Sequence, residues 1–189
     1  MTRDEILKLK AVTLYVLNRC GGELDFIHLF KILYFAEREH YATYGKHLIN
    51  DTFCALERGP VPSFLYDAVK VVIGVSSCSE SSPLRLISSA LSPAGGECCY
   101  YVIHAIEQPD MDELSRAAIA SLDKSIADNL AKDSKQLSKD SHDEAWCEAW
   151  SCKHASPMNS LSIAKAGGAS DGFLTYIKEQ EELDRLLAD

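Results

Sequence analysis

The sequence predicts a mainly α-helical (α+β) fold, in which a single helical domain spanning residues 1–189 carries a small antiparallel β element. Apolar residues recur with the helical period along most of the chain. Two short runs, residues 51–57 and 98–105, instead have the composition of strands. The length of 189 residues suits one domain with a sizeable core.

The first two helices are predicted to form a hairpin. Thr2 and Glu5 have the spacing of a capping box, in which the two side chains satisfy early backbone N–H groups. The two glycines at 21–22 stop this helix, so the next one, residues 25–44, should return antiparallel. Gly45 follows its last turn, where a residue with positive φ is often required.

A short strand, a turn and a third helix follow. Residues 51–57 alternate loosely between apolar and polar side chains, as a strand would. Gly59 to Pro62 should break this strand as a turn, with Gly59 supplying an unusual φ. Pro62 suits the first turn of the next helix, where its missing N–H is no loss. That helix is expected to end at Gly74.

The second half of the chain is predicted to be helical after a loop. Residues 74–97 are rich in Ser, Gly and Pro, which predicts a loop with one weak helical piece. Residues 98–105 predict a second strand, which we expect to pair with residues 51–57. Later helices are predicted after an N-cap at Ser115, over residues 142–150 and over residues 173–187.

Composition predicts a cytoplasmic globular protein. The formal net charge of −9 and the pI of about 5.1 argue against broad binding to nucleic acid or to an anionic membrane. The longest apolar run is too short to span a bilayer, and Met1–Glu5 opens an amphipathic helix, not a signal peptide. The seven cysteines are an odd number without the spacing of a disulfide framework, which favours a reducing compartment.

A zinc site is the first alternative that the sequence raises. Cys147, Cys152, His142 and His154 are of the residue types that bind zinc, but their spacing matches no familiar zinc motif. On a helix, His142 and Cys147 would face directions about 140° apart. We therefore expect neither a metal nor a cofactor.

An acid–base site is the second alternative. Glu37 and Glu39 lie on different faces of the predicted helix, which is typical of a solvated, salt-bridged surface. A hydrolase could still use His142 with Glu37 or Asp67. His142 and Trp146 are one helical turn apart, so their rings can share a face. For this pair we favour a core tryptophan with a hydrogen-bonded histidine over a partner-binding role.

A DNA-binding regulator is the third alternative. Residues 162–170 imitate the turn of a helix-turn-helix motif, with residues 171–187 as the would-be recognition helix. That helix carries two basic and five acidic residues, a net charge of 2 − 5 = −3, which is unfavourable in a phosphate-lined groove. A helix–loop–helix packing turn explains the pattern better.

The residues between 31 and 67 have a distinctive order: Lys31, Leu33-Tyr34-Phe35-Ala36, Arg38, His40, Tyr44-Gly45, Asp51-Thr52, Gly59-Pro60-Val61-Pro62-Ser63 and Leu65-Tyr66-Asp67. This order resembles the signature of the Panacea domain, found in SocA-like antitoxins. Asp110–Ser115 is similar to the Leu-Ser helix start of that family, and the Ser-His-x-x-x-Trp element is matched by Ser141, His142 and Trp146. The similarity covers most of the chain and is weakest in residues 74–97.

The resemblance implies an antitoxin or antitoxin-like protein, and not an enzyme. Such a protein would neutralise a protein toxin by direct binding, or act as an adaptor that delivers the toxin to an AAA+ protease. It also implies that the following residues form the structural motif of the domain: Lys31, Tyr34, Phe35, Gly45, Asp51, Gly59, Pro60, Val61, Pro62, Tyr66, Asp67, His142 and Trp146.

The partner-binding surface is predicted by subtraction. Apolar residues of the signature have the spacing of a core, so its polar and aromatic residues should face outward or line a groove. The candidates are Arg38, His40, Tyr41, Tyr44 and Lys46, followed by Tyr176 and Glu179 on the terminal helix. For Arg38 and His40, a semi-buried network is the alternative. The acidic chain suggests a basic partner, because complementary charge speeds encounter.

Overall fold

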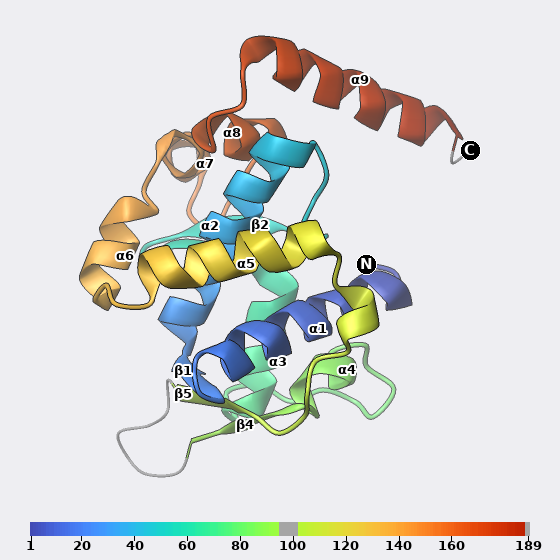
Figure 1. Ribbon diagram of the computed structural model, residues 1–189. Helices are drawn as coiled ribbons and strands as arrows, with labels where there is room; N and C mark the ends of the chain where they lie inside the picture. The colour runs from blue at the N-terminus through green and yellow to red at the C-terminus, as the bar shows by residue number, and fades with distance from the viewer. Residues whose placement is uncertain (95–101, 188–189) are drawn as a thin grey trace.

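The computed structural model describes residues 1–94 and 102–187 and confirms the mainly α-helical fold with a small β element (Figure 1). The helices are α1 (Arg3–Arg19), α2 (Phe26–Tyr44), α3 (Ser63–Val72), α4 (Arg85–Ser88), a 3₁₀ turn (Met111–Glu113), α5 (Arg116–Asn129), α6 (Ser134–Asp140), α7 (Glu144–Cys152), α8 (Ser160–Ala166) and α9 (Asp171–Leu187). The strands are β1 (Glu23–Asp25), β2 (Phe53–Leu56), β3 (Gly59–Pro62), β4 (Leu91–Pro93) and β5 (Val102–Ala105).

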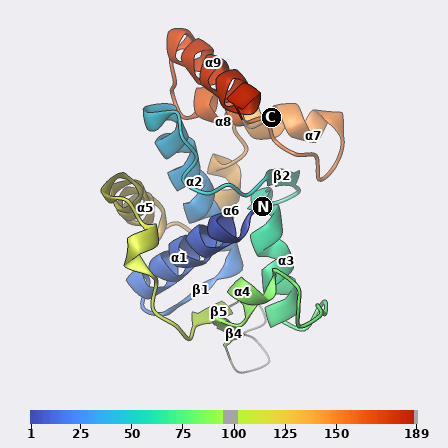
Figure 2. The ribbon, with the colours of Figure 1, turned by 90° about the vertical axis from the view of Figure 1, so that its right-hand side faces the viewer.

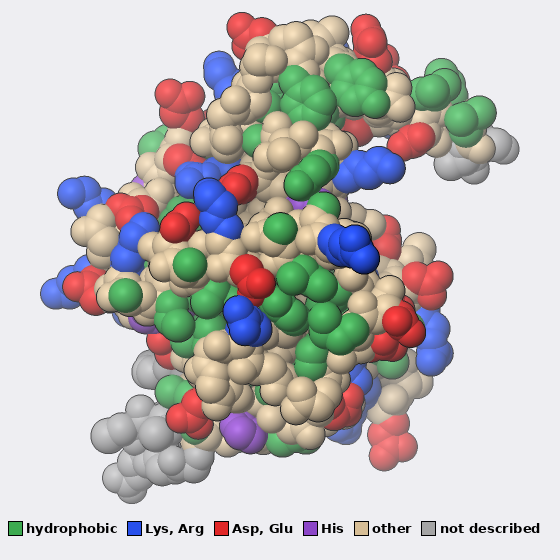
Figure 3. All heavy atoms as spheres, viewed as in Figure 1, with side chains coloured by type: hydrophobic (Ala, Val, Ile, Leu, Met, Phe, Trp, Pro, Cys, Tyr) green, Lys and Arg blue, Asp and Glu red, His purple; other side chains and the backbone are tan. Residues whose placement is uncertain are grey.

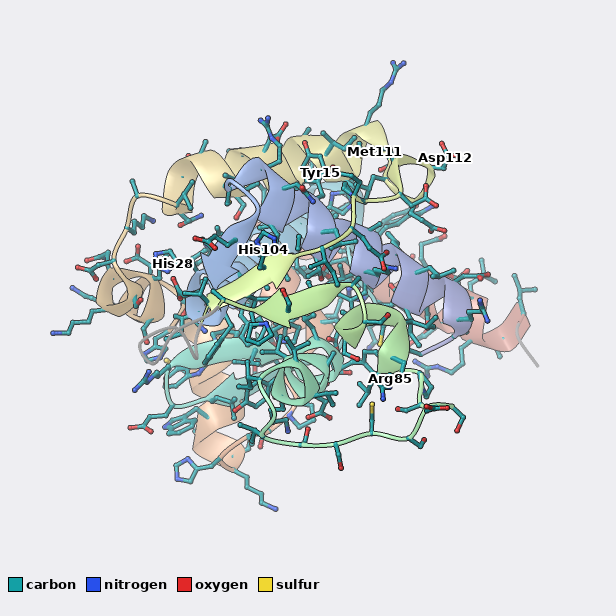
Figure 4. The ribbon with its side chains drawn as sticks, turned by 90° about the horizontal axis from the view of Figure 1, so that it is seen from below. Tyr15, His28, Arg85, His104, Met111 and Asp112 are labelled. Carbon is teal, nitrogen blue, oxygen red and sulfur yellow. The ribbon has the colours of Figure 1, made fainter. Side chains whose placement is uncertain are left out.

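Helix α2 is the centre of the molecule. It packs against α5 on one side and against the β2–β3 hairpin on the other, with α6 and α8 also in contact (Figures 1 and 2). Eleven of its residues are buried, including Leu29, Ile32, Leu33 and Tyr34. Helix α1 joins the same core, and its Tyr15 lies between α1 and α5, where the hydroxyl donates to Asp123 at 2.9 Å (Figure 4).

The strands pair differently from the sequence-based prediction. Strand β2 pairs with β3 as a tight hairpin, with Phe53 opposite Pro62 and Leu56 opposite Gly59. Strand β5 instead lies between β1 and β4 in an antiparallel sheet. The prediction that residues 51–57 pair with residues 98–105 is therefore wrong. Its residues 98–101 lie outside the described part of the chain.

The Gly-Pro-Val-Pro segment is a strand, not the predicted turn. The chain reverses one step earlier, at Glu57 and Arg58, so Gly59–Pro62 returns along β2 with all four residues buried. Two prolines can be accommodated because β3 is an edge strand, where a missing N–H breaks few ladder bonds. Gly59 has φ +98°, as expected, and Pro62 is the residue before α3 and not part of its first turn.

The predicted helix ends are mostly confirmed, because capping depends on nearby residues. Thr2 and Glu5 form the capping box. Gly45 ends α2 with φ +64°, and the Ser115 hydroxyl accepts from the Ala118 N–H. The helix predicted from His142 begins two residues later, because the Asp143 side chain caps it by accepting from the Trp146 N–H.

The loop predicted at residues 74–97 contains the expected short helix and also a strand, and its residues 95–97 lie outside the described part of the chain. Helix α4 packs on α1 and α3, and β4 joins the sheet with β5. Among the described residues, no helix combines the length and the apolar character that crossing a bilayer requires.

Gly59 and Gly74 offer a matched pair of substitutions. Both have positive φ, but a Cβ at Gly59 would collide with the Ser141 hydroxyl, whereas a Cβ at Gly74 would meet nothing. We expect Gly74→Ala to lower the free energy of unfolding by about 1–2 kcal/mol. Gly59→Ala should cost about 1–3 kcal/mol more, because it adds overpacking to the same backbone strain. Urea unfolding of both variants measures the difference, and equal losses would show that the contact at Gly59 is not tight.

Candidate functional site

The family-like residues converge where α2 meets the β2–β3 hairpin and the corner between α6 and α7. Lys31 is at the centre of this region and is only 2 % exposed. Its Nζ donates to the Pro60 carbonyl at 2.7 Å, and among the described residues no carboxylate forms an ion pair with it. Burial lowers the pKa of Lys31 to about 7. The amine therefore joins α2 to the hairpin without a counter-charge.

The corner between α6 and α7 closes over this amine. The fully buried Ser141 lies against Gly59 and donates its own hydroxyl to the Ser138 carbonyl. The His142 ring stacks on Trp146 with centroids 3.8 Å apart, and the indole N–H donates to the Leu56 carbonyl. Burial and then the nearby Lys31 charge lower the pKa of His142. The pair does share a face, and it packs at the turn end of the hairpin, beside Leu56.

Asp143 is the polar centre that the sequence analysis missed. One of its oxygens caps α7, and the other accepts from the Tyr34 hydroxyl and from the Arg38 guanidinium, both at 2.8 Å. The Arg38 guanidinium also lies over the Phe35 ring, 4.9 Å from its centroid. The one feature of the sequence that could have indicated a role for Asp143 is its position at the start of a predicted helix, where Asp is a favoured N-cap.

Glu37 is buried, contrary to the prediction of a solvated, salt-bridged surface. Its carboxylate accepts from the N–H groups of Leu48 and Ile49 at 2.9 and 3.0 Å and from the His47 ring. Burial alone would lower the pKa of His47, but the hydrogen bond and charge of Glu37 outweigh it and raise the pKa. Glu37 thus fixes the loop after α2. Glu39 does pair at the surface, with Lys124.

Asp51 fixes the start of α3, as Glu37 fixes the loop after α2. Its carboxylate accepts from the N–H groups of Phe64 and Leu65, each at 3.0 Å, and from the Ser63 hydroxyl. Pro62, the residue before this helix, has no side chain that could accept a hydrogen bond. Asp51, more than ten residues earlier in the chain, satisfies the free N–H groups instead. Burial raises the pKa of Asp51, and its hydrogen bonds oppose that shift.

Tyr66 and Asp67 lie on α3, away from these carboxylates. The Tyr66 ring meets Phe30 of α2 edge-on with centroids 5.9 Å apart, and Asp67 forms a surface ion pair with Lys70. Tyr66 therefore helps to pack α3 on α2, whereas Asp67 is exposed.

Two of the five partner-binding candidates are buried: the expectation of an outward-facing side chain is wrong for Tyr41, and His40 takes the network position that was its alternative. Tyr41 is 1 % exposed and donates its hydroxyl to Glu181 of α9. His40 is 6 % exposed and shares a hydrogen bond with Ser121 of α5. Both are covered by helices that come much later in the chain, which local spacing could not reveal.

The other three candidates differ in exposure. The Arg38 side chain is 25 % exposed and belongs to the Asp143 network. Tyr44 is 48 % exposed, and Lys46 is also exposed. Tyr176 and Glu179 of α9 are exposed as well. Partner binding by these residues stays a prediction.

The structure does not assemble the hydrolase that the sequence left open. Glu37 binds His47 and the following loop, and Asp67 pairs with Lys70, so neither carboxylate is bonded to His142. Within residues 1–94 and 102–187, no three His, Cys, Asp or Glu side chains are grouped as a metal site would require. Cys147 approaches the His142 carbonyl and not its ring.

A cavity of about 640 Å³ lies between α2, α5, α6 and α8. Its charged side chains are balanced, because Lys124 pairs with Glu39 and Lys132 pairs with Asp140. Since basic and acidic groups neutralise one another across its walls, the cavity favours no ligand of either charge.

The different roles of Arg38 and Tyr44 predict different losses of stability when each is replaced by alanine. Arg38→Ala should lower the free energy of unfolding by about 1–3 kcal/mol, because it removes a hydrogen bond and leaves the Asp143 carboxylate undersatisfied. Tyr44→Ala should change it by less than about 0.5 kcal/mol, as is usual for a surface position. Urea unfolding compares the two variants. A larger loss for Tyr44→Ala would contradict the assigned roles.

Comparison with known proteins identifies the family of the chain. No curated protein and no solved structure matches the chain. A family model does match: that of the antitoxin SocA-like, Panacea domain, over residues 29–147, which is more than half of the chain. This range contains most of α2, the whole β2–β3 hairpin and the start of α7 with Asp143. The chain therefore belongs to the SocA-like Panacea domain family.

Proposed function

We propose that this protein is an antitoxin-like module that binds a protein toxin and neutralises it, either by direct inhibition or as an adaptor for proteolysis. The observation that carries the proposal is the match of residues 29–147 to the SocA-like antitoxin domain. A helical fold alone would support no function, because similar folds serve many.

The internal chemistry of the domain is consistent with a binding scaffold. Lys31, Glu37, Asp51 and Asp143 all contact backbone groups that position neighbouring elements. Their polar groups are therefore used in holding α2, the hairpin, α3 and α7 together. Binding would then depend on the outer surface of this scaffold.

The negative net charge of the chain favours a basic partner. At a net charge of −9, the protein would attract a basic toxin and repel nucleic acid. The proposal places both proteins in the cytoplasm. It leaves two modes of action, since the complex could be inhibitory in itself or could present the toxin to an AAA+ protease.

Co-expression tests the proposal. A toxin-like gene beside the gene for this protein should arrest growth when expressed alone, and co-expression of this protein should restore growth. The two proteins should co-purify at a fixed ratio. Direct inhibition predicts an unchanged toxin half-life, whereas delivery to a protease predicts a shorter one. An unrelated toxin serves as the control, and growth arrest that persists although both partners are present would refute the proposal.

A further inference from the structure

Exposed large apolar side chains are concentrated on α9. Tyr176 and Leu183 are 49 % and 47 % exposed, and Leu186 and Leu187 are 75 % and 76 % exposed. Figure 3 shows hydrophobic side chains at several places along α9, at the top of the molecule. A cluster of exposed apolar side chains marks an interaction site more often than scattered ones do.

A different face of α9 attaches it to the domain. Ile177 is 1 % exposed and lies with Phe173 against Gly45, at the end of α2. Glu181 accepts the hydroxyl of the buried Tyr41. Beyond Glu181 every described residue of the helix is exposed, and this part extends away from the body of the molecule (Figure 1).

Helix geometry separates the two faces. At 100° per residue, Leu183 and Leu187 lie within about 20° of Tyr176 around the helix axis, so the three form one line. Ile177 lies about 100° away from that line. We call Tyr176, Leu183 and Leu187 the α9 stripe. The contacts that hold α9 in place leave this stripe about half exposed or more, although the Tyr176 ring stacks on Phe173 with centroids 5.8 Å apart.

Acidic residues border the α9 stripe on both sides. Glu179 lies about 60° to one side of Tyr176, and Asp184 lies about 80° to the other. Both basic residues, Lys178 and Arg185, lie about 160–180° away, on the back of the helix. The stripe is therefore apolar with carboxylates along its edges, although the helix carries charges of both signs.

We propose that the α9 stripe binds a basic amphipathic segment of a partner protein. An amphipathic helix with apolar side chains three and four residues apart would cover Tyr176, Leu183 and Leu187. Lys and Arg beside those side chains would meet Glu179 and Asp184. The inference rests on the proposed function in that the partner is the toxin. The stripe lies outside residues 29–147, so the family match does not assign it.

Charge disfavours two other occupants. A second copy of the chain would bring its own Glu179 and Asp184 against the same carboxylates. An anionic membrane would be repelled by the acidic edges, because interfacial helices of this kind use Lys and Arg on their polar face.

A designed peptide tests the proposal with the full chain. The probe is a fluorescent 18-residue helical peptide of leucine and lysine, compared with a peptide in which every lysine is glutamate. The leucine–lysine peptide should bind, measured by fluorescence anisotropy, and the leucine–glutamate peptide should not. The double variant Leu183→Gln, Leu187→Gln should bind the basic peptide at least tenfold more weakly.

Matched variants exclude general effects of charge and stability. Lys178→Gln with Arg185→Gln changes the back of α9 and should not weaken binding. Glu179→Gln with Asp184→Gln should weaken it and make it less sensitive to salt. All three double variants should melt at the temperature of the parent protein, because the substituted side chains are exposed.

Three outcomes would overturn the proposal. The first is equal binding of the basic peptide by the parent and by Leu183→Gln, Leu187→Gln. The second is a concentration-dependent dimer that this variant abolishes, measured by sedimentation. The third is flotation with neutral phosphatidylcholine vesicles that requires the same leucines.

The toxin separates this inference from the proposed function. If the parent and Leu183→Gln, Leu187→Gln rescue growth equally, the docking surface is wrong while the antitoxin role stands. If the parent fails to rescue, the antitoxin role is wrong, and the peptide measurement alone decides whether the stripe binds a basic segment.

Discussion

The buried amine of Lys31 is the contact on which the rest of the domain depends. It joins α2 to the Pro60 carbonyl, and Gly59 must lack a side chain so that the amine and Ser141 can both fit. Burying a charged amine without a carboxylate costs free energy. The hydrogen bond to the Pro60 carbonyl offsets part of this cost, and the lowered pKa leaves the amine partly neutral near pH 7. The hairpin held in this way then receives the Trp146 indole on its Leu56 carbonyl.

Three buried or half-buried carboxylates act on the protein's own backbone. Glu37 holds the loop after α2, Asp51 supplies the N–H groups of α3 with an acceptor, and Asp143 does so for α7 while also joining Tyr34 and Arg38. Glu37 and Asp51 make these contacts across 11 to 14 residues of chain, whereas Asp143 caps α7 locally and reaches Tyr34 and Arg38 from more than 100 residues away. These carboxylates are therefore occupied in holding neighbouring elements together.

Local features of this fold could be predicted from sequence, and long-range ones could not. The caps at Thr2, Gly45 and Ser115 follow from residues within one turn. The burial of Glu37 and Tyr41 depends on a loop and on α9, which reaches Tyr41 from 140 residues away. The prediction of strand pairing was wrong for the same reason. Strand β2 pairs with β3, just after the turn at Glu57, and not with the distant β5. Which face of α9 is exposed could likewise be learned only from its contacts with α2 in the structure.

The most direct test measures the stability of Lys31→Met against pH. The amine titrates near 10.5 in the unfolded chain and about 7 in the folded one, so between these values the unfolded chain binds more protons. The free energy of unfolding should therefore rise from pH 7 to pH 9 through this group. Urea unfolding should show a smaller rise, or none, for Lys31→Met, which keeps the hydrocarbon and lacks the amine. Parallel pH profiles for the two proteins would contradict a buried, unpaired Lys31.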